Sequence, residues 1–420
     1  MSFQKRQHQD SGSDGDSDVA LSLKANRHKK RFVQVESESE TDQTSESFQV
    51  TSQLESPNNI FAQKHILHGI ESLRKSVWAT DEGFQQNLKP VNGVDLQRLA
   101  KALRKAILHK VVLPIDAEDY FLMSRDHRHN YLANWRSQQR QPYFFSENTV
   151  FVDQKGNALV WYLPNLLSEQ LKHRAFADTA LIDKKLASGI QKVISEVSSN
   201  KGKKWRANPS WFVNTHHISH VRPGVANFSF GWRPSGKERT SVDIAPSLSL
   251  RGDSDECDES ATRTWLKRIE ALQLTVSLIL SVIHPELFEA GRGVLAFCCA
   301  PESHKGSTHE WASQWNSVYT ALTVICGRKS PAHVDSHGSV KYLDALVSLG
   351  TATKPRMTLQ ELGASFSYKA GTLMFFSGKA WTHEVLEWGK GERICYASYM
   401  RPEMIEAHGL SVDGWGACVI

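Results

Sequence analysis

The fold of this chain is decided by the stretch Arg328-Lys-Ser-Pro-Ala-His333-Val-Asp335-Ser-His-Gly338. His333 and Asp335 stand two residues apart, and successive side chains of a β-strand point to opposite faces of its sheet. On an extended segment the imidazole and the carboxylate therefore point to the same side. This pair is predicted to supply half of a metal site.

A second histidine completes the predicted ligand set. His383 follows the segment Gly371-Thr-Leu-Met-Phe-Phe-Ser-Gly-Lys-Ala-Trp-Thr, in which an apolar strand and a turn can return the chain to the same point. Two histidines and one carboxylate on one face of an iron ion leave coordination positions open, which is typical of non-haem Fe(II) oxygenases. We interpret His333, Asp335 and His383 as Fe(II) ligands and as the catalytic residues.

The predicted cosubstrate residue is Arg393, in the strand-like run Gly389-Lys-Gly-Glu-Arg-Ile-Cys-Tyr-Ala-Ser-Tyr. The planar fork of an arginine binds a carboxylate through two parallel hydrogen bonds. A buried Arg393 can therefore hold the distal carboxylate of 2-oxoglutarate while the oxo-acid end chelates iron. His-x-Asp alone is a weak signal, and it is the order His-x-Asp, distal His, then Arg that makes the pattern specific.

In these residues the sequence resembles the Fe(II)/2-oxoglutarate dioxygenase superfamily, and within it the Tet/JBP family of DNA methyl-base oxygenases, in its fungal, transposon-associated branch. The likeness covers roughly residues 200 to 405. It implies that Fe(II), 2-oxoglutarate and O2 are the cofactors, and that Arg328 contacts the oxo-acid end of the cosubstrate. It also implies that the fold is a double-stranded β-helix.

The resemblance further implies a methylated base in double-stranded DNA as the substrate. Candidates are 5-methylcytosine, oxidised to its hydroxymethyl, formyl and carboxyl forms, and N6-methyladenine, whose hydroxylated methyl group leaves as formaldehyde. Either base must leave the helical stack to reach the iron. Two alternatives stay open, namely a dioxygenase that acts on RNA or protein and a catalytically silent DNA-binding module. The intact ligand set argues against the silent module.

Two further residues are candidates for the wall of a base pocket. Family members place such groups just past the ligand pair and shortly after the last strand of the domain, which here means His337 and Arg401. The alternative for both is an ordinary surface role.

Composition and charge favour an intracellular protein with a polyanionic partner, and the alternative is a mild basic excess of the kind that is common in proteins that bind none. The 420 residues include 50 Lys and Arg against 45 Asp and Glu, and many of the acidic residues lie in the N-terminal tail, so the remainder is more basic than the formal charge of +5. The six cysteines form no Cys-x-x-Cys pair and are interpreted as free thiols. No apolar run is long enough to cross a bilayer, so we expect a soluble monomer without a membrane partner.

Residues 1–60 are predicted to be a disordered tail, because Ser, Asp, Glu and Gln dominate and little apolar surface is available to bury. Within it, Lys24-Ala-Asn-Arg-His-Lys-Lys-Arg31 is a basic cluster of the kind that directs nuclear import. The alternative is a solvated charge run. We favour a nuclear location.

Residues 61–200 are predicted to be a mainly helical region that packs on the core. Apolar residues at helical spacing indicate a helix over 95–113, ended by Pro114, with a basic face. A second basic element covers 125–140. Either can bind phosphates, and the alternative for each is a solvated helix face.

A third basic cluster, Lys203, Lys204 and Arg206, opens an aromatic-rich stretch. Interleaved cations and aromatic rings suit a nucleic-acid groove in which bases stack and phosphates pair. Aromatic core strands explain the same composition. The three histidines at 216, 217 and 220 lack a Cys or carboxylate that would complete a metal site and are assigned a structural or surface role.

Residues 201–420 are predicted to form the dioxygenase core, in an α+β fold with a jelly roll flanked by helices. Its expected parts are a mobile acidic loop at 251–264, a helix over 265–283 ended by Pro285, and strands near 293–299, 317–326, 333–335, 371–376 and 393–399.

Overall fold

The computed structural model describes residues 59–80, 83–84, 87–138, 143–197, 205–213, 220–232, 244–251, 259–300 and 308–418. The predictions for the N-terminal tail and its basic cluster, for Lys203 and Lys204, and for the histidines at 216 and 217 lie outside these residues. In the described part of the chain, no helix is both long enough and apolar enough to cross a membrane.

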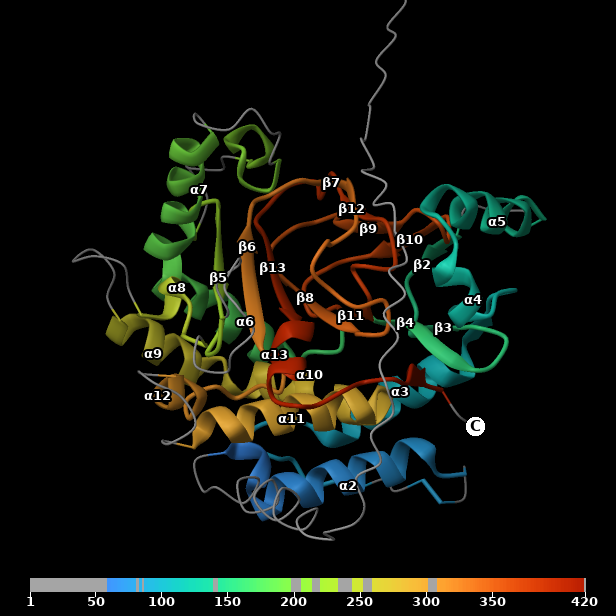
Figure 1. The fold of residues 1–420 in the computed structure, drawn as a ribbon, viewed down its shortest axis with the longest axis horizontal. Coiled ribbons are helices and arrows are strands. Elements are labelled where there is room, and N and C mark those ends of the chain that lie inside the picture. Colours follow the sequence, from blue (N-terminus) through green and yellow to red (C-terminus); the bar gives the residue numbers. More distant parts are fainter. Residues whose placement is uncertain are drawn as a thin grey trace, which may run out of the picture. The chain divides into compact units, whose positions relative to one another are not determined.

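Two β-sheets form the centre of the fold (Figure 1). The larger has the strand order β1-β3-β4-β11-β8-β13-β6-β5, with β14 on β4, and the smaller has the order β2-β10-β9-β12-β7. The strands are β1 (Lys110–Val112), β2 (Tyr143–Phe145), β3 (Thr149–Val152), β4 (Asn157–Leu163), β5 (Gly224–Phe228), β6 (Ala321–Cys326), β7 (Ser330–His333), β8 (Asp344–Gly350), β9 (Arg356–Leu359), β10 (Ala364–Ser367), β11 (Leu373–Phe376), β12 (His383–Val385), β13 (Arg393–Tyr399) and β14 (Gly416–Ala417).

Helices surround the sheets (Figure 1). They are η1 (Ile60–Ala62), α2 (Lys64–Trp78), α3 (Leu96–Leu108), α4 (Ala117–Leu122), α5 (Arg125–Gln138), α6 (Glu169–Asp178), η2 (Thr179–Ile182), α7 (Asp183–Val197), η3 (Trp205–Ala207), η4 (Pro209–Trp211), α8 (Leu248–Arg251), α9 (Glu259–Arg268), α10 (Glu270–Ile283), α11 (Pro285–Cys299), α12 (Thr308–Ala312) and α13 (Pro402–Ala407). Helix α3 packs on β3 and β4, α6 on β8, and α7 on β5, while α10 packs against α2, α6 and α11.

The two faces of the large sheet contribute to different hydrophobic cores, because successive side chains of each strand point to opposite faces. On β11, Leu373 and Phe375 join the core beneath the helices, whereas Met374 and Phe376 join the layer between the two sheets. This inter-sheet layer is filled by aromatic and aliphatic side chains around β2, β9 and β10. The predicted jelly roll with flanking helices is therefore confirmed as an α+β fold of two facing sheets.

Several predicted elements differ from the structure. The run 293–299, expected as a strand, is the second half of α11, because buried residues continue from Leu287 through Cys299 at helical spacing. The helix expected over 265–283 is two helices that meet at Ile269. Pro285 begins the next helix, because the first N–H groups of a helix have no partner within the helix and a proline there loses no hydrogen bond. The predicted loop 251–264 is helical from Glu259 onward, with Arg263 bonded to Glu259.

The mainly helical region before residue 200 also contributes to both sheets. The preceding region supplies four strands, and β4 lies inside the large sheet between β3 and β11. Helix α3 ends at Leu108 rather than at Pro114, and the residues between them form β1, which pairs with β3 in parallel. Residues 59–197 therefore supply helices that pack on the sheets and strands that belong to them.

Candidate active site

The three predicted metal ligands lie together. His333 is the last residue of β7 and His383 is the first of β12, and the two strands pair so that these residues are direct neighbours across the small sheet. Their ring centroids are 4.1 Å apart. Asp335 follows β7, and its backbone N–H donates to the Gly378 carbonyl at 2.8 Å. Chain reversal between β11 and β12 thus brings His383 back to His333 as predicted.

The ligand atoms are placed for a single ion. One nitrogen from each histidine and one oxygen of Asp335 lie within 4.8 Å of one another. Nε2 of His333 is 3.8 Å from Oδ1 of Asp335, and Nε2 of His383 is 3.8 Å from Oδ2. The other ring nitrogen of each histidine contacts a backbone carbonyl, that of Pro331 at 2.7 Å and that of Trp381 at 3.0 Å. Because a carbonyl accepts only from N–H, each Nδ1 carries the proton and each Nε2 offers its lone pair.

Electrostatics keep the ligands in metal-binding protonation states. Burial lowers the pKa of His333 and of His383, so both imidazoles are neutral at pH 7. Burial by itself raises the pKa of Asp335, but His383, His333 and Arg206 outweigh it and hold that pKa below its usual range. A metal ligand set requires neutral imidazoles and an ionised carboxylate, and these pKa shifts favour both.

Two buried arginines next to the triad fit a dicarboxylate. Arg393 and Arg328 are 3% and 6% exposed, and Arg393 Nη1 donates to the Arg328 carbonyl at 2.9 Å. Nε of each guanidinium is buried and has no hydrogen-bond partner among the described residues. Burial, Arg393 and Arg206 lower the pKa of Arg328 to about 9, which leaves it charged at pH 7. Buried charges and unpaired donors of this kind are costly unless an anion binds them, so these residues fit 2-oxoglutarate.

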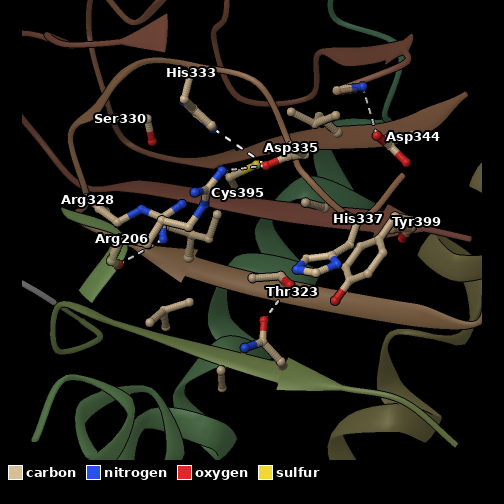
Figure 2. A pocket seen from close by; sticks show the side chains of 18 of the residues that line it. Arg206, Thr323, Arg328, Ser330, His333, Asp335, His337, Asp344, Cys395 and Tyr399 are labelled. Carbon is tan, nitrogen blue, oxygen red and sulfur yellow. Dashed lines mark hydrogen bonds and ion pairs between the residues drawn. The ribbon is translucent and has the colours of Figure 1, made fainter. Parts of the chain in front are cut away.

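The triad and the arginines share one cavity of about 950 Å³ between the two sheets (Figure 2). The arginines Arg206 and Arg328 lie at one end, with Cys395 beside them, and His337, Tyr399 and Thr323 lie together at the other end. Since a strand rises about 3.3 Å per residue, the part of β13 that lines the cavity from Arg393 to Tyr399 extends about 20 Å. The cavity therefore continues well past the space that the cosubstrate needs.

Several cavity residues were not predicted from the sequence. Thr323 on β6 pairs with Asn227 on β5 and with Ala397 on β13, and its hydroxyl and the Asn227 amide oxygen are 2.6 Å apart. Tyr399 and the half-buried Asp344 also line this cavity. Burial and Asp335 raise the pKa of Asp344 well above its usual value, and the Gly378 N–H donates to it at 2.9 Å. For these residues, the only sequence feature that could have predicted a place in the cavity was the alternation of side chains along β13, which puts Tyr399 on the same face as Arg393.

The predicted base-pocket residues His337 and Arg401 both line the cavity. His337 is exposed at the rim and lies beside Tyr399 (Figure 2). The Arg401 guanidinium carbon lies 3.5 Å from the centroid of the Trp232 ring, and its Nε is buried without a partner among the described residues. An unpaired donor at the far end from Arg393 is placed to meet a polar group of a substrate.

The basic residues expected to contact phosphates are largely engaged within the protein. Arg98 and Arg104 donate to backbone carbonyls at the ends of neighbouring segments, and Arg128 and Arg136 donate to the carbonyls of Ala380 and Gln360. Arg206 donates to Asp335 at 2.7 Å. All five residues thus have partners within the fold, and Arg206 lies beside the candidate metal ligands.

Comparison with known families agrees with this geometry. Residues 249–402 match Tet_JBP, the oxygenase domain of the 2OGFeDO superfamily. This part of the chain is a Tet_JBP oxygenase domain. The match includes the three candidate metal ligands, Arg328, Arg393 and Arg401, whereas Arg206 and Asn227 lie before its first residue. Enzymes of the 2OGFeDO superfamily use Fe(II), 2-oxoglutarate and O2, so the domain is a 2-oxoglutarate-dependent oxygenase with His333, Asp335 and His383 as its candidate metal ligands.

Two solved structures are similar to the chain at 12% identity. NgTET1 in complex with 5mC DNA has a TM-score of 0.39, and the match covers 69% of this chain and 92% of that one. A C-terminally truncated Neurospora crassa protein in its apo form has a TM-score of 0.21, with 61% and 100% covered. Among curated proteins, none matches the chain by sequence.

Proposed function

We propose that this protein oxidises methylated bases in DNA. The observation that carries the proposal is the length of the cavity (Figure 2). Its wall holds the triad, the buried Arg328 lies at one end with Arg393 bonded to its carbonyl, and a polar and aromatic compartment lies at the other end. At about 950 Å³ it is at the upper end of the range of small-molecule sites, so a substrate group fits beside the cosubstrate. The Tet_JBP match supports a methylated base as that group.

The two ends of the cavity have separate tasks. When bound, Fe(II) with 2-oxoglutarate supplies the O2 chemistry that oxidises a methyl C–H bond. Arg393 holds the distal carboxylate of the cosubstrate, and Arg328 contacts its oxo-acid end. At the other end, Tyr399 and His337 enclose a flat ring, and Thr323 with Asn227 offers hydrogen-bonding groups from the floor of the cavity. A substrate methyl placed between these ends lies against the metal ligands.

The substrate base has to leave the duplex to enter this cavity. Both 5-methylcytosine and N6-methyladenine present a methyl group on the edge of a flat ring, and we propose that oxidation of the first gives hydroxymethyl-, formyl- and carboxylcytosine. Oxidation of the second gives adenine and formaldehyde. We further propose that the enzyme acts as a monomer on double-stranded DNA in the nucleus.

The test is mass spectrometry of nucleosides after incubation with one duplex that carries both methyl marks, with Fe(II) and 2-oxoglutarate present. We expect oxidised cytosine, demethylated adenine or both, and none with His383→Ala. Turnover of methylated RNA or of a protein substrate, with no reaction on the duplex, would favour the alternative substrate classes. Binding of the duplex without conversion, and with no consumption of 2-oxoglutarate on any substrate class, would indicate a silent binding module.

A further inference from the structure

One ion pair at the metal site is not explained by binding of cosubstrate or base. Arg206 Nη2 lies 2.7 Å from Oδ1 of Asp335 and 3.4 Å from the carbonyl of Val334. The pair joins η3, which precedes the matched oxygenase domain in sequence, to the ligand loop after β7. Each carboxylate oxygen also faces one histidine at 3.8 Å, Oδ1 facing His333 and Oδ2 facing His383. The two oxygens therefore differ in that only Oδ1 is paired with Arg206.

We propose that Arg206 is a positioning residue that holds Oδ1 of Asp335, so that the carboxylate offers the metal one oxygen instead of two. A carboxylate that binds through both oxygens occupies an additional coordination position. The proposed chemistry needs open positions for the cosubstrate chelate and for O2. Arg206 therefore keeps a position open by occupying the second oxygen. This inference rests on the iron site of the proposed function and concerns the geometry of that site alone.

The guanidinium is held by contacts that also belong to the site. It lies over the Trp205 ring at 4.9 Å, and the Arg328 guanidinium lies over the same ring at 5.0 Å. Trp205 packs edge-on against His333, with 4.6 Å between ring centroids. Arg328 Nη1 donates to the Arg206 carbonyl at 3.0 Å. Trp205 and Arg206 are therefore fixed between a metal ligand and a cosubstrate residue, which gives the ion pair a defined direction.

The carboxylate is constrained from its other side as well. The Asp335 N–H is bonded to Gly378, and a Cβ at Gly378 would lie 2.5 Å from Oδ2. The glycine at position 378 therefore leaves room for Oδ2, the backbone hydrogen bond fixes the start of the Asp335 side chain, and Arg206 holds Oδ1. Contacts of this kind matter because the partners of metal ligands fix how the ligands bind.

The test counts water molecules on the bound metal. Mn(II) is loaded into the protein without cosubstrate or DNA, and the relaxation of water protons reports how many exchangeable waters the ion carries. With three protein ligand atoms, a six-coordinate ion keeps about three waters. In Arg206→Met we expect about one water fewer, because the freed carboxylate binds through both oxygens. Arg206→Lys, which restores the charge at this position, is expected to recover most of the lost water.

The matched control is Arg222→Met. Arg222 also pairs with an aspartate, Asp183, at 2.7 Å, and its side chain is 49% exposed against 45% for Arg206, but it lies outside the cavity. The control should keep the wild-type water count. Thermal melting of each variant shows that it is folded, and Arg206→Gln replaces Arg206→Met if the latter does not fold. Equal water counts in wild type, Arg206→Met and Arg206→Gln would overturn the role of Arg206.

The outcomes also separate this inference from the substrate assignment. Relaxation is measured without nucleic acid, so a failure to oxidise DNA leaves the result on Arg206 unchanged. If the wild-type protein does not bind Mn(II) at all, the metal site itself is wrong, and both the role of Arg206 and the proposed function are overturned.

Discussion

The two ends of the inter-sheet layer are built from the same two sheets and differ in what fills them. At the filled end, Phe366 on β10 packs against Phe145, Phe151 and Tyr162, with ring centroids 5.0–5.8 Å apart. At the hollow end, β5, β6 and β13 present Thr323, Cys395, Ala397 and their neighbours to the cavity of about 950 Å³. The ring of Phe376, 5.3 Å from that of His383, lies where the two ends meet.

This difference shows how one architecture supplies both stability and a site. Large aromatic side chains on both sheets close the filled end and contribute buried apolar area. Small or polar residues on the large sheet leave the hollow end open opposite the two histidines. The helices beneath the large sheet fill their own core, so the hollow end does not have to stabilise the fold. Changes at each end are therefore expected to have separable effects.

The largest effect is expected from removing a metal ligand at the hollow end. His383→Ala should reduce turnover to background, because two remaining ligands hold the ion weakly and in the wrong geometry. Melting temperature without metal should stay close to that of wild type. Activity is followed by nucleoside mass spectrometry and the fold by circular dichroism. Substantial turnover at saturating Fe(II) would contradict the ligand assignment.

The next largest effect is expected at Gly378, beneath the ligand carboxylate. In Gly378→Ala the new methyl group would lie 2.5 Å from Asp335 Oδ2 and 3.0 Å from Asp344 Oδ2, so the ligand must move. We expect metal affinity to fall at least about tenfold, the usual cost of disturbing the support of a ligand. Gly338→Ala is the matched control, because its new methyl group would meet only the Cβ of Lys379 at 3.4 Å. Calorimetric titration with metal measures both, and similar losses in the two variants would contradict the packing argument.

Removing a large side chain from the filled end should lower the free energy of unfolding and leave catalytic turnover unchanged. Phe366 is fully buried, so Phe366→Ala should cost about 3–5 kcal/mol of the free energy of unfolding. Phe144, on the neighbouring strand β2 and 51% exposed, is the control, and Phe144→Ala should cost much less. Denaturant unfolding measures both changes. Turnover per folded molecule should stay near wild type in each, and a selective loss of activity in Phe366→Ala would show that the two ends are coupled.

Filling the hollow end should have the smallest effect on stability. Ala397 lies on the cavity floor between Thr323 and Leu346 in the paired strands, so Ala397→Leu extends into open space. We expect a change below about 1 kcal/mol, in contrast to overpacking of a closed core. Oxidation of methylated DNA should fall strongly, while 2-oxoglutarate binding, measured by calorimetry, should be kept. Unchanged oxidation would place the substrate compartment elsewhere.

Much of the candidate site could be predicted because its chemistry follows a local order in the chain. His333 and Asp335 are two residues apart, His383 follows an apolar strand and a turn, and Arg393 begins the next strand. The role of each residue can therefore be predicted from its neighbours in the sequence. The jelly roll followed from the same short strands. The helix at 293–299 was missed because a short run of apolar residues has no period of its own, and its helical register comes from the residues before it.

The tertiary structure alone decided which distant residues meet at the site. Thr323, Asn227 and Tyr399 reach the cavity because β5, β6 and β13 pair, and Arg206 reaches Asp335 across 129 residues of sequence. Strand pairing between segments this far apart in the chain produces no periodic pattern in the sequence that would predict the contact. A basic residue in an aromatic stretch predicts a phosphate contact, and only its position beside a carboxylate shows another role. The sequence by itself determined the ligand chemistry, and packing determined where the layer is filled and where it is open, because cavities depend on the summed volumes of side chains from many strands.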